Sequence, residues 1–201
     1  MTQLSDAKRE CILEAATRMF LSQGYTNVSV DAIAEAAPVS KPTLYNYFES
    51  KPALFEAVVA RQCERSLLAL ERIDASASDL REGLRLIARA CVDLIYSPES
   101  LRLFRLIIAE QSAFPELGKL AYRSAPAPII ARVAKYLGKF EPSTSLAFED
   151  VDEAARVFIG LLMGDDHVRC LIGLKANLTN RDKDRLVNRA VELYWRVQHG
   201  K

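Results

Sequence analysis

Apolar residues recur every three or four positions near the start of the chain, which is the spacing of one buried helix face. The pattern predicts a helix over residues 6–23, and Gly24 is placed to end it. The apolar stripe consists of Ile12, Ala16, Met19 and Phe20.

Two short apolar patterns follow, each preceded by a serine. Ser29 is suited to cap a helix over residues 30–36, and Ser40 is suited to cap another over residues 41–47. Pro38 stands between them and forces a turn, because the residue before a proline avoids the helical region. Two short helices joined by a tight turn, with a preceding helix to pack on, describe a helix-turn-helix.

The rest of the chain has the pattern of further helices separated by prolines and small polar residues. β-branched residues never alternate with polar ones over a useful span, so no strand is expected. The chain is therefore predicted to be all-α, with about nine helices. After residue 50 they are expected over 51–73, 79–96 and 99–112, then a short and a longer one ending near 140, then 149–174 and 180–199, with a loop at 141–145.

The second short helix has the side-chain chemistry of a helix that contacts DNA. Ile33, Leu44 and Phe48 would pack inward, leaving a polar side outward in the major groove. Lysine can donate to guanine, asparagine can pair with adenine, and tyrosine hydroxyls can reach phosphate oxygens. The alternative is that the two tyrosines are core aromatics. The outward set is Lys41, Thr43, Tyr45, Asn46 and Tyr47.

The run from Ser29 to Phe55, SVDAIAEAAPVSKPTLYNYFESKPALF, resembles the DNA-binding signature of the TetR family of transcriptional regulators. The resemblance implies a homodimer that places two recognition helices in successive major grooves of a palindromic operator. It also implies that Lys51 grips a phosphate at a helix start, where the helix dipole favours an anion. The predicted DNA-binding set is Ser29, Ser40, Lys41, Thr43, Tyr45, Asn46, Tyr47 and Lys51.

Pro38 departs from the family pattern, which usually has glycine at this position. Glycine permits a positive φ in the turn, whereas the pyrrolidine ring holds φ near about −65° and cannot adopt one. We therefore expect either a turn of another form or a slightly reoriented pair of helices.

Residues 101–110, 114–117 and 158–165 are similar to the C-terminal domain of AefR-like members of the same family. The resemblance implies a DNA-binding domain over residues 1–52 and a ligand-binding and dimerisation domain over residues 53–201. The expected function is that of a repressor released from its operator by a small lipophilic effector, with activation also open. The effector pocket is expected to be lined by Leu67, Cys91, Phe104, Ile108, Tyr122, Phe158 and Leu162.

The last two predicted helices carry more apolar surface than one core requires. This is expected of helices that also pack against a two-fold mate, whereas all-round burial in a monomer is the alternative. The predicted dimer interface consists of Val151, Ala155, Leu186, Val187, Ala190, Val191 and Tyr194.

Composition narrows the class further. The net charge is +1, and the first sixty residues hold five cations against seven acids, so DNA binding must rest on a few well-placed cations. The four cysteines lie far apart and form no CxxC pair, so we expect reduced, mostly buried thiols and neither a metal site nor a cofactor.

The sequence also bears on location and on rival functions. A polar, charged start and the absence of an apolar run of about 18 residues lead us to expect a soluble, cytoplasmic protein without a membrane partner. An enzyme is disfavoured, because the chain has two histidines and no Gly-rich phosphate loop or nucleophile motif. An architectural DNA-binding protein is the second rival, and it would not need the 150 residues that follow the helix-turn-helix.

Overall fold

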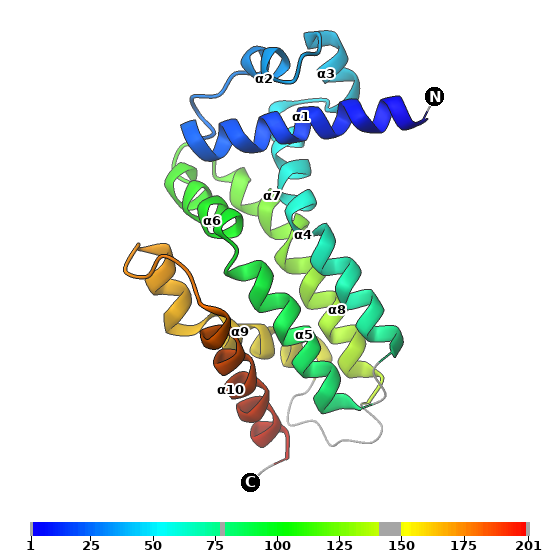
Figure 1. Cartoon of the computed structure of the whole chain (residues 1–201), viewed down its shortest axis with the longest axis vertical. Helices are drawn as coiled ribbons and strands as arrows, with labels where there is room; N and C mark the ends of the chain where they lie inside the picture. Colours follow the sequence, from blue (N-terminus) through cyan, green and yellow to red (C-terminus); the bar gives the residue numbers. More distant parts are fainter. Residues whose placement is uncertain (1, 77–78, 141–149, 200–201) are drawn as a thin grey trace. The chain divides into compact units, whose positions relative to one another are not determined.

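The structure is a computed structural model that describes residues 2–76, 79–140 and 150–199, and all regular secondary structure in these residues is α-helical (Figure 1). The all-α class expected from the sequence is confirmed, and the loop expected at 141–145 lies outside the described residues. The helices are α1 (Thr2–Gln23), α2 (Val30–Ala36), α3 (Lys41–Tyr47), α4 (Lys51–Ser76), α5 (Leu80–Ile95), α6 (Pro98–Glu110), α7 (Glu116–Ser124), α8 (Pro126–Gly138), α9 (Val151–Leu171) and α10 (Asn180–His199).

The chain forms two compact units, and the division between them falls inside α4 and inside α6. The first unit contains the residues up to Gln62 together with Arg102–Ala125, and the second contains the rest. The domain boundary predicted between residues 52 and 53 stays a prediction, because compact units defined by contacts need not coincide with the domains of a protein family.

The first unit is built around α1, whose buried stripe packs with the helices that follow it. An aromatic cluster lies at the end of α1, where the Tyr25 ring meets Phe55 at 5.4 Å and Phe114 at 5.1 Å between centroids. Edge contacts of this kind add to the free energy gained by burying the rings. The core of this unit therefore holds the start of α4 and the segment after α6 against the end of α1.

The second unit packs α8 against α9, and α10 against both α5 and α9. The Phe158 ring on α9 meets the Tyr194 ring on α10 at 5.1 Å, and both side chains are fully buried. These helices therefore form a bundle with its own apolar core.

Helix α9 is interrupted at Gly164, which has φ 48° and ψ −159°. Only glycine adopts such a conformation readily. Beside this break, the Tyr96 hydroxyl lies 3.1 Å from the Leu162 carbonyl oxygen and 2.6 Å from that of Met163, so its one proton is donated to this pair of acceptors. The long helix predicted over about residues 149–174 is present as α9, but it ends at Leu171 and contains a kink that the sequence did not indicate.

Candidate functional site

Two serine caps fix the helix-turn-helix, residues 29–48, as the sequence predicted. The Ser29 Oγ accepts from the backbone N–H of Ala32 at 3.1 Å and starts α2. The Ser40 Oγ accepts from the backbone N–H of Thr43 at 3.2 Å and starts α3. Each cap satisfies a donor that the helix itself leaves open. The bounds predicted for both short helices are confirmed.

The turn between them keeps the left-handed backbone that glycine would give. Pro38 has φ 23°, so the expectation that proline cannot adopt a positive φ at this position is wrong. The Val39 N–H donates to the Ala34 carbonyl at 3.0 Å, the six-to-one bond of a helix C-terminal Schellman turn. Because the pyrrolidine ring prefers a φ of about −65°, the backbone at Pro38 is strained.

One side of α3 is buried and the other is open. Leu44 and the cap residue Phe48 lie in the core, whereas Tyr45 and Asn46 are exposed. Tyr47 is half-buried and packs against the same core, so only part of its side chain is free to contact DNA. The exposed side chains form a short polar surface held by two apolar anchors.

Lys41, at the first position of α3, is paired with an acid of α2. Its Nζ lies 2.8 Å from Asp31 Oδ1 and 3.0 Å from Asp31 Oδ2. The hydrogen bond that Lys41 donates to the Asp31 carboxylate, together with the negative charge of that carboxylate, raises the pKa of Lys41. The sequence analysis singled out Lys41 but missed Asp31, whose position ten residues earlier carries no local signal for this contact.

Lys51, the predicted phosphate contact, lies over an aromatic ring. Its Nζ is 4.3 Å from the centroid of Tyr25, a favourable cation–π geometry. Partial burial lowers the pKa of Lys51, and the Glu110 carboxylate opposes that shift. Burial, with the charges of Glu116 and Glu110, raises the pKa of Tyr25 to about 12, so its hydroxyl stays protonated.

The end of α6 holds the turn that leads into α2. The Glu110 carboxylate accepts from the Thr26 N–H at 3.1 Å and from the Thr26 hydroxyl. Gly24 makes this approach possible, because a Cβ there would lie 2.9 Å from Glu110 Oε1. The Thr26 hydrogen bonds are the main cause that lowers the pKa of Glu110.

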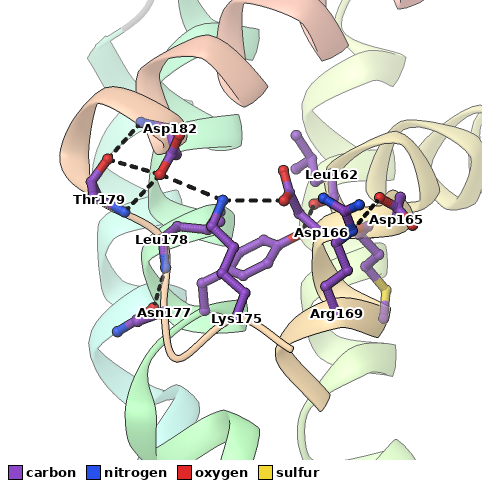
Figure 2. Close-up of polar contacts among 11 residues, drawn as sticks. Leu162, Asp165, Asp166, Arg169, Lys175, Asn177, Leu178, Thr179 and Asp182 are labelled. Atoms are coloured by element: carbon purple, nitrogen blue, oxygen red, sulfur yellow. Dashed lines mark hydrogen bonds and ion pairs between the residues drawn. The ribbon is translucent and has the colours of Figure 1, made fainter. Parts of the chain in front are cut away.

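The second unit contains a cavity of about 570 Å³ along α9, α10 and their connection. Figure 2 shows Lys175 between two carboxylates, with its Nζ 3.2 Å from Asp166 and 3.5 Å from Asp182. Arg185 and Arg189 also line the cavity, and neither has an ion-pair partner within the described part of the chain. The remaining lining comes mostly from small and apolar residues, Gly160, Leu161, Met163, Gly164, Leu186, Ala190 and Leu193.

The residues predicted for the dimer interface occupy mainly the inner side of α9 and α10. Five of the seven are buried within the chain itself, and two, Val151 and Leu186, are half-buried. A different apolar set on the same helices is exposed. The buried residues of the predicted interface are Ala155, Val187, Ala190, Val191 and Tyr194. The exposed apolar residues, which were not part of the predicted interface, are Val157, Val168, Leu193 and Val197.

The residues predicted for an effector pocket are divided between the two units. Leu67, Cys91, Phe158 and Leu162 belong to the second unit, where the last three are fully buried and Leu67 is half-buried. Phe104, Ile108 and Tyr122 belong to the first unit, where Ile108 is 59% and Tyr122 53% exposed. The pocket thus remains a prediction, with its firmest part in the second unit.

The cysteines and carboxylates form no metal site among the described residues. Cys63, Cys91 and Cys170 are buried, as expected, and Cys11 is exposed. Burial raises the pKa of the Cys63 thiol to about 11 and that of Cys91 to about 12, which keeps both protonated and unreactive at neutral pH. None of the described helices has the length and apolarity that crossing a bilayer requires.

Two family profiles match the chain. Residues 12–58 match the bacterial regulatory proteins of the tetR family, and residues 82–197 match the C-terminal domain of AefR-like transcriptional repressors. The second match alone covers more than half of the chain.

Curated relatives match over shorter stretches. The HTH-type transcriptional activator FasR of Mycolicibacterium smegmatis is 36% identical over 90 residues, which is 45% of this chain and 41% of that protein. The HTH-type transcriptional regulator UidR of Escherichia coli is 39% identical over 59 residues, 29% of this chain and 30% of that protein. The chain thus spans less than half the length of these relatives.

Solved structures match over nearly the whole chain. A crystal structure from Mesorhizobium loti, assigned to the TetR-family transcriptional regulators, has a TM-score of 0.82 at 28% identity and covers 98% of both chains. The Flavonoid-responsive Regulator FrrA has a TM-score of 0.73 at 33% identity, covering 94% of this chain and 95% of that one.

Proposed function

Because the chain belongs to the TetR family of bacterial regulatory proteins, we propose that it is a ligand-responsive repressor. In this proposal a homodimer binds a palindromic operator through two copies of the helix-turn-helix, and a small lipophilic effector releases it. DNA-binding transcription regulation is the shared activity of the family, whereas the repressor role, the operator and the effector are specific to the proposal.

The polar side of α3 is the observation that carries the DNA-binding part. Lys41, Tyr45 and Asn46 are exposed on a helix whose opposite side is fixed by Leu44 and Phe48. A short helix held this way can enter a major groove without rearranging its own core. The acidic balance of the first sixty residues makes these few positions decisive, since the overall field adds little attraction.

Selection from a pool of randomised DNA duplexes tests this part. The full-length chain should enrich a palindrome, and a reporter placed downstream of it should fall when the chain is expressed. A reporter that rises instead would make the chain an activator, as the name of the FasR relative says of that protein. A pool that yields no enriched sequence would contradict the DNA-binding proposal itself.

The exposed apolar side of α9 and α10 supports dimerisation. Val157 and Val168 on α9 and Leu193 and Val197 on α10 are exposed, and Leu193 lines the cavity together with Arg185 and Arg189. Several exposed apolar side chains on neighbouring helices are typical of a surface that another protein covers. We assign it to the two-fold partner, because the family acts as dimers and the effector is expected in an apolar pocket.

The effector proposal centres on the apolar residues of α5 and α9, which pack against each other. Cys91 on α5 and Phe158 and Leu162 on α9 are fully buried, and Leu67 on α4 is half-buried. FrrA is by its name flavonoid-responsive, and it is the relative with the widest match above 30% identity described above, so a flavonoid is the first ligand class to test. Both α4 and α6 run from one unit into the other and offer continuous helices for coupling.

Calorimetry with and without operator DNA tests the coupling. An effector that lowers operator affinity by some factor must bind the operator complex more weakly by the same factor. A flavonoid that binds equally well to the free and the DNA-bound chain would contradict release by this ligand. A flavonoid that does not bind would remove that class and leave the wider lipophilic set to be screened by thermal shift.

A further inference from the structure

The helix-turn-helix contains a single cationic side chain, which forms an ion pair with an acidic side chain. Lys41 is the one lysine or arginine between residues 30 and 50. Asp31, in the first turn of α2, contacts its Nζ with both carboxylate oxygens, at 2.8 and 3.0 Å. The side chains of Lys41 and Asp31 are 53% and 65% exposed, so the pair lies at the surface of the helix-turn-helix.

Each member of the pair keeps hydrogen-bonding capacity toward solvent. An ammonium group has three N–H donors, and a carboxylate has about four acceptor positions. The two contacts between Lys41 and Asp31 use only part of either set. A donor and an acceptor therefore lie next to one another, both within reach of a ligand.

This combination matches one base pair of DNA. In the major groove, guanine offers the acceptors N7 and O6, while the cytosine paired to it offers the N4 amino donor. Lysine can donate to the guanine and a carboxylate can accept from the cytosine amino group. An unpaired carboxylate would be repelled by the phosphates, but contact with Lys41 leaves this pair with no net charge.

We propose that Asp31 is a specificity-determining residue of the operator contact. Asp31 accepts from cytosine N4 while Lys41 donates to the guanine of the same base pair, so the two side chains act as one reading unit. The inference rests on the proposed binding of DNA through α3. It assigns to α2 a contact with a base, whereas Ser29 on the same helix caps its start.

A neutralising role is the competing explanation. In that case Asp31 only cancels the charge of Lys41, and removing it would strengthen binding to every DNA sequence alike. The two explanations differ in what a change at Asp31 does to base preference, independently of affinity.

The test compares motifs selected from randomised DNA duplexes by four full-length proteins: wild type, D31N, K41A and E35Q. Glu35 is the matched control, because it is an exposed acid on the same helix one turn beyond Asp31. D31N and E35Q thus remove the same charge from one helix at different distances from Lys41. Circular dichroism melting confirms that each variant is folded.

We expect the wild type to select a G·C pair at one position of each half-site, with discrimination of about ten-fold or more against other pairs. D31N and K41A should both reduce discrimination at that same position to about two-fold or less, while E35Q keeps the wild-type motif. An asparagine at position 31 can also shift the preference toward adenine, which would equally support base contact.

Two results overturn the proposal. If D31N selects the wild-type motif and binds all sequences more tightly, Asp31 is a neutralising residue and the DNA-binding proposal still stands. If the wild type enriches no motif, DNA binding and the role of Asp31 fail together.

Discussion

The helix-turn-helix and the α9–α10 pair use apolar residues in different ways. In α3, seven residues supply one buried anchor, Leu44, and the cap Phe48 adds a second, so the opposite side is left free. In α9 and α10, apolar residues lie on an inner side, which is buried in the chain, and also on an outer side, which is exposed. An apolar pattern therefore indicates which residues favour burial. In α3 the two anchors pack into the core of the chain itself. In α9 and α10 the pattern alone does not separate the residues that the chain buries from those that it leaves exposed.

The inner side of α10 gives the largest expected effect. Val191 is 1% exposed, so Val191→Glu places a charge in the core of the second unit without a partner. Such a change costs about 3–5 kcal/mol of the free energy of unfolding. Urea unfolding followed by circular dichroism should show this loss. A stably folded variant that is merely monomeric would return Val191 to the dimer interface where the sequence placed it.

A charge on the outer side of α10 should leave the fold stable and instead weaken dimerisation. Leu193 is 40% exposed and lines the cavity, so Leu193→Glu should fold normally and lose the dimer. A two-fold interface contains the substitution twice, and we expect dimer dissociation to become on the order of 100-fold easier. Sedimentation velocity at micromolar concentration measures it. A variant that stays as dimeric as wild type would move the interface away from this surface.

The same contrast explains what the sequence could predict. The bounds of α2 and α3 follow from Ser29, Ser40 and Pro38, which act on the backbone within three or four residues. These are local effects, and a local pattern is enough to locate them. The bounds of both short helices were therefore predictable from the sequence nearly residue by residue, whereas their contacts with DNA stay a prediction.

Other features depend on residues far apart in the chain. The inner and outer sides of α10 look alike in sequence, because both carry apolar residues at helical spacing. The contact between Thr26 and Glu110 spans 84 positions, and no periodicity signals it. The kink at Gly164 is accompanied by a contact with Tyr96, the residue that ends α5, whose hydroxyl donates to the carbonyl of Met163. Tertiary packing decides all three.

A substitution in the turn of the helix-turn-helix should change the stability of the protein by an intermediate amount. Pro38→Gly relieves a positive φ and restores an N–H donor for the end of α2. Strain of this kind costs about 1–3 kcal/mol, and the greater freedom of glycine in the unfolded chain offsets about 1 kcal/mol of the gain. We expect a net stabilisation of about 1 kcal/mol in thermal unfolding. A destabilised variant would mean that the turn does not hold Pro38 at a positive φ.

Lys51 should affect affinity without changing base preference. Lys51→Ala removes the proposed phosphate contact, so operator binding should weaken uniformly and the slope of log affinity against log salt should fall by about one unit. Fluorescence anisotropy titrations at several salt concentrations measure the slope. Lys119→Ala, at an exposed lysine of α7, is the control. Equal slopes for wild type and Lys51→Ala would remove Lys51 from the contact.

The smallest effect concerns the turn before α2. Because the Thr26 hydrogen bonds hold the pKa of Glu110 below its ordinary value of 4.5, the contact stabilises the folded state above about that pH. This stabilisation is lost as the pH falls through the lower, folded-state pKa. Thr26→Val should lower stability at pH 7 by less than about 1 kcal/mol, since solvent screens the exposed carboxylate.

Urea unfolding at pH 7 and near pH 3 separates this electrostatic contribution from simple packing. The difference between wild type and Thr26→Val should shrink at the lower pH, and Thr26→Ser should behave as wild type at both. A difference that is the same at both values would mean that the Glu110 charge contributes nothing.

Hydroxyl-radical footprinting of the full-length chain on its selected DNA tests the central claim most directly. Two helix-turn-helix units in a two-fold dimer should protect two patches on one side of the duplex, centred about 10 base pairs or a small multiple of a helical turn apart. Leu193→Glu should abolish both patches together, because a single helix-turn-helix binds too weakly alone. A single protected patch, or protection that survives in a Leu193→Glu monomer, would contradict a dimeric repressor that contacts DNA through α3.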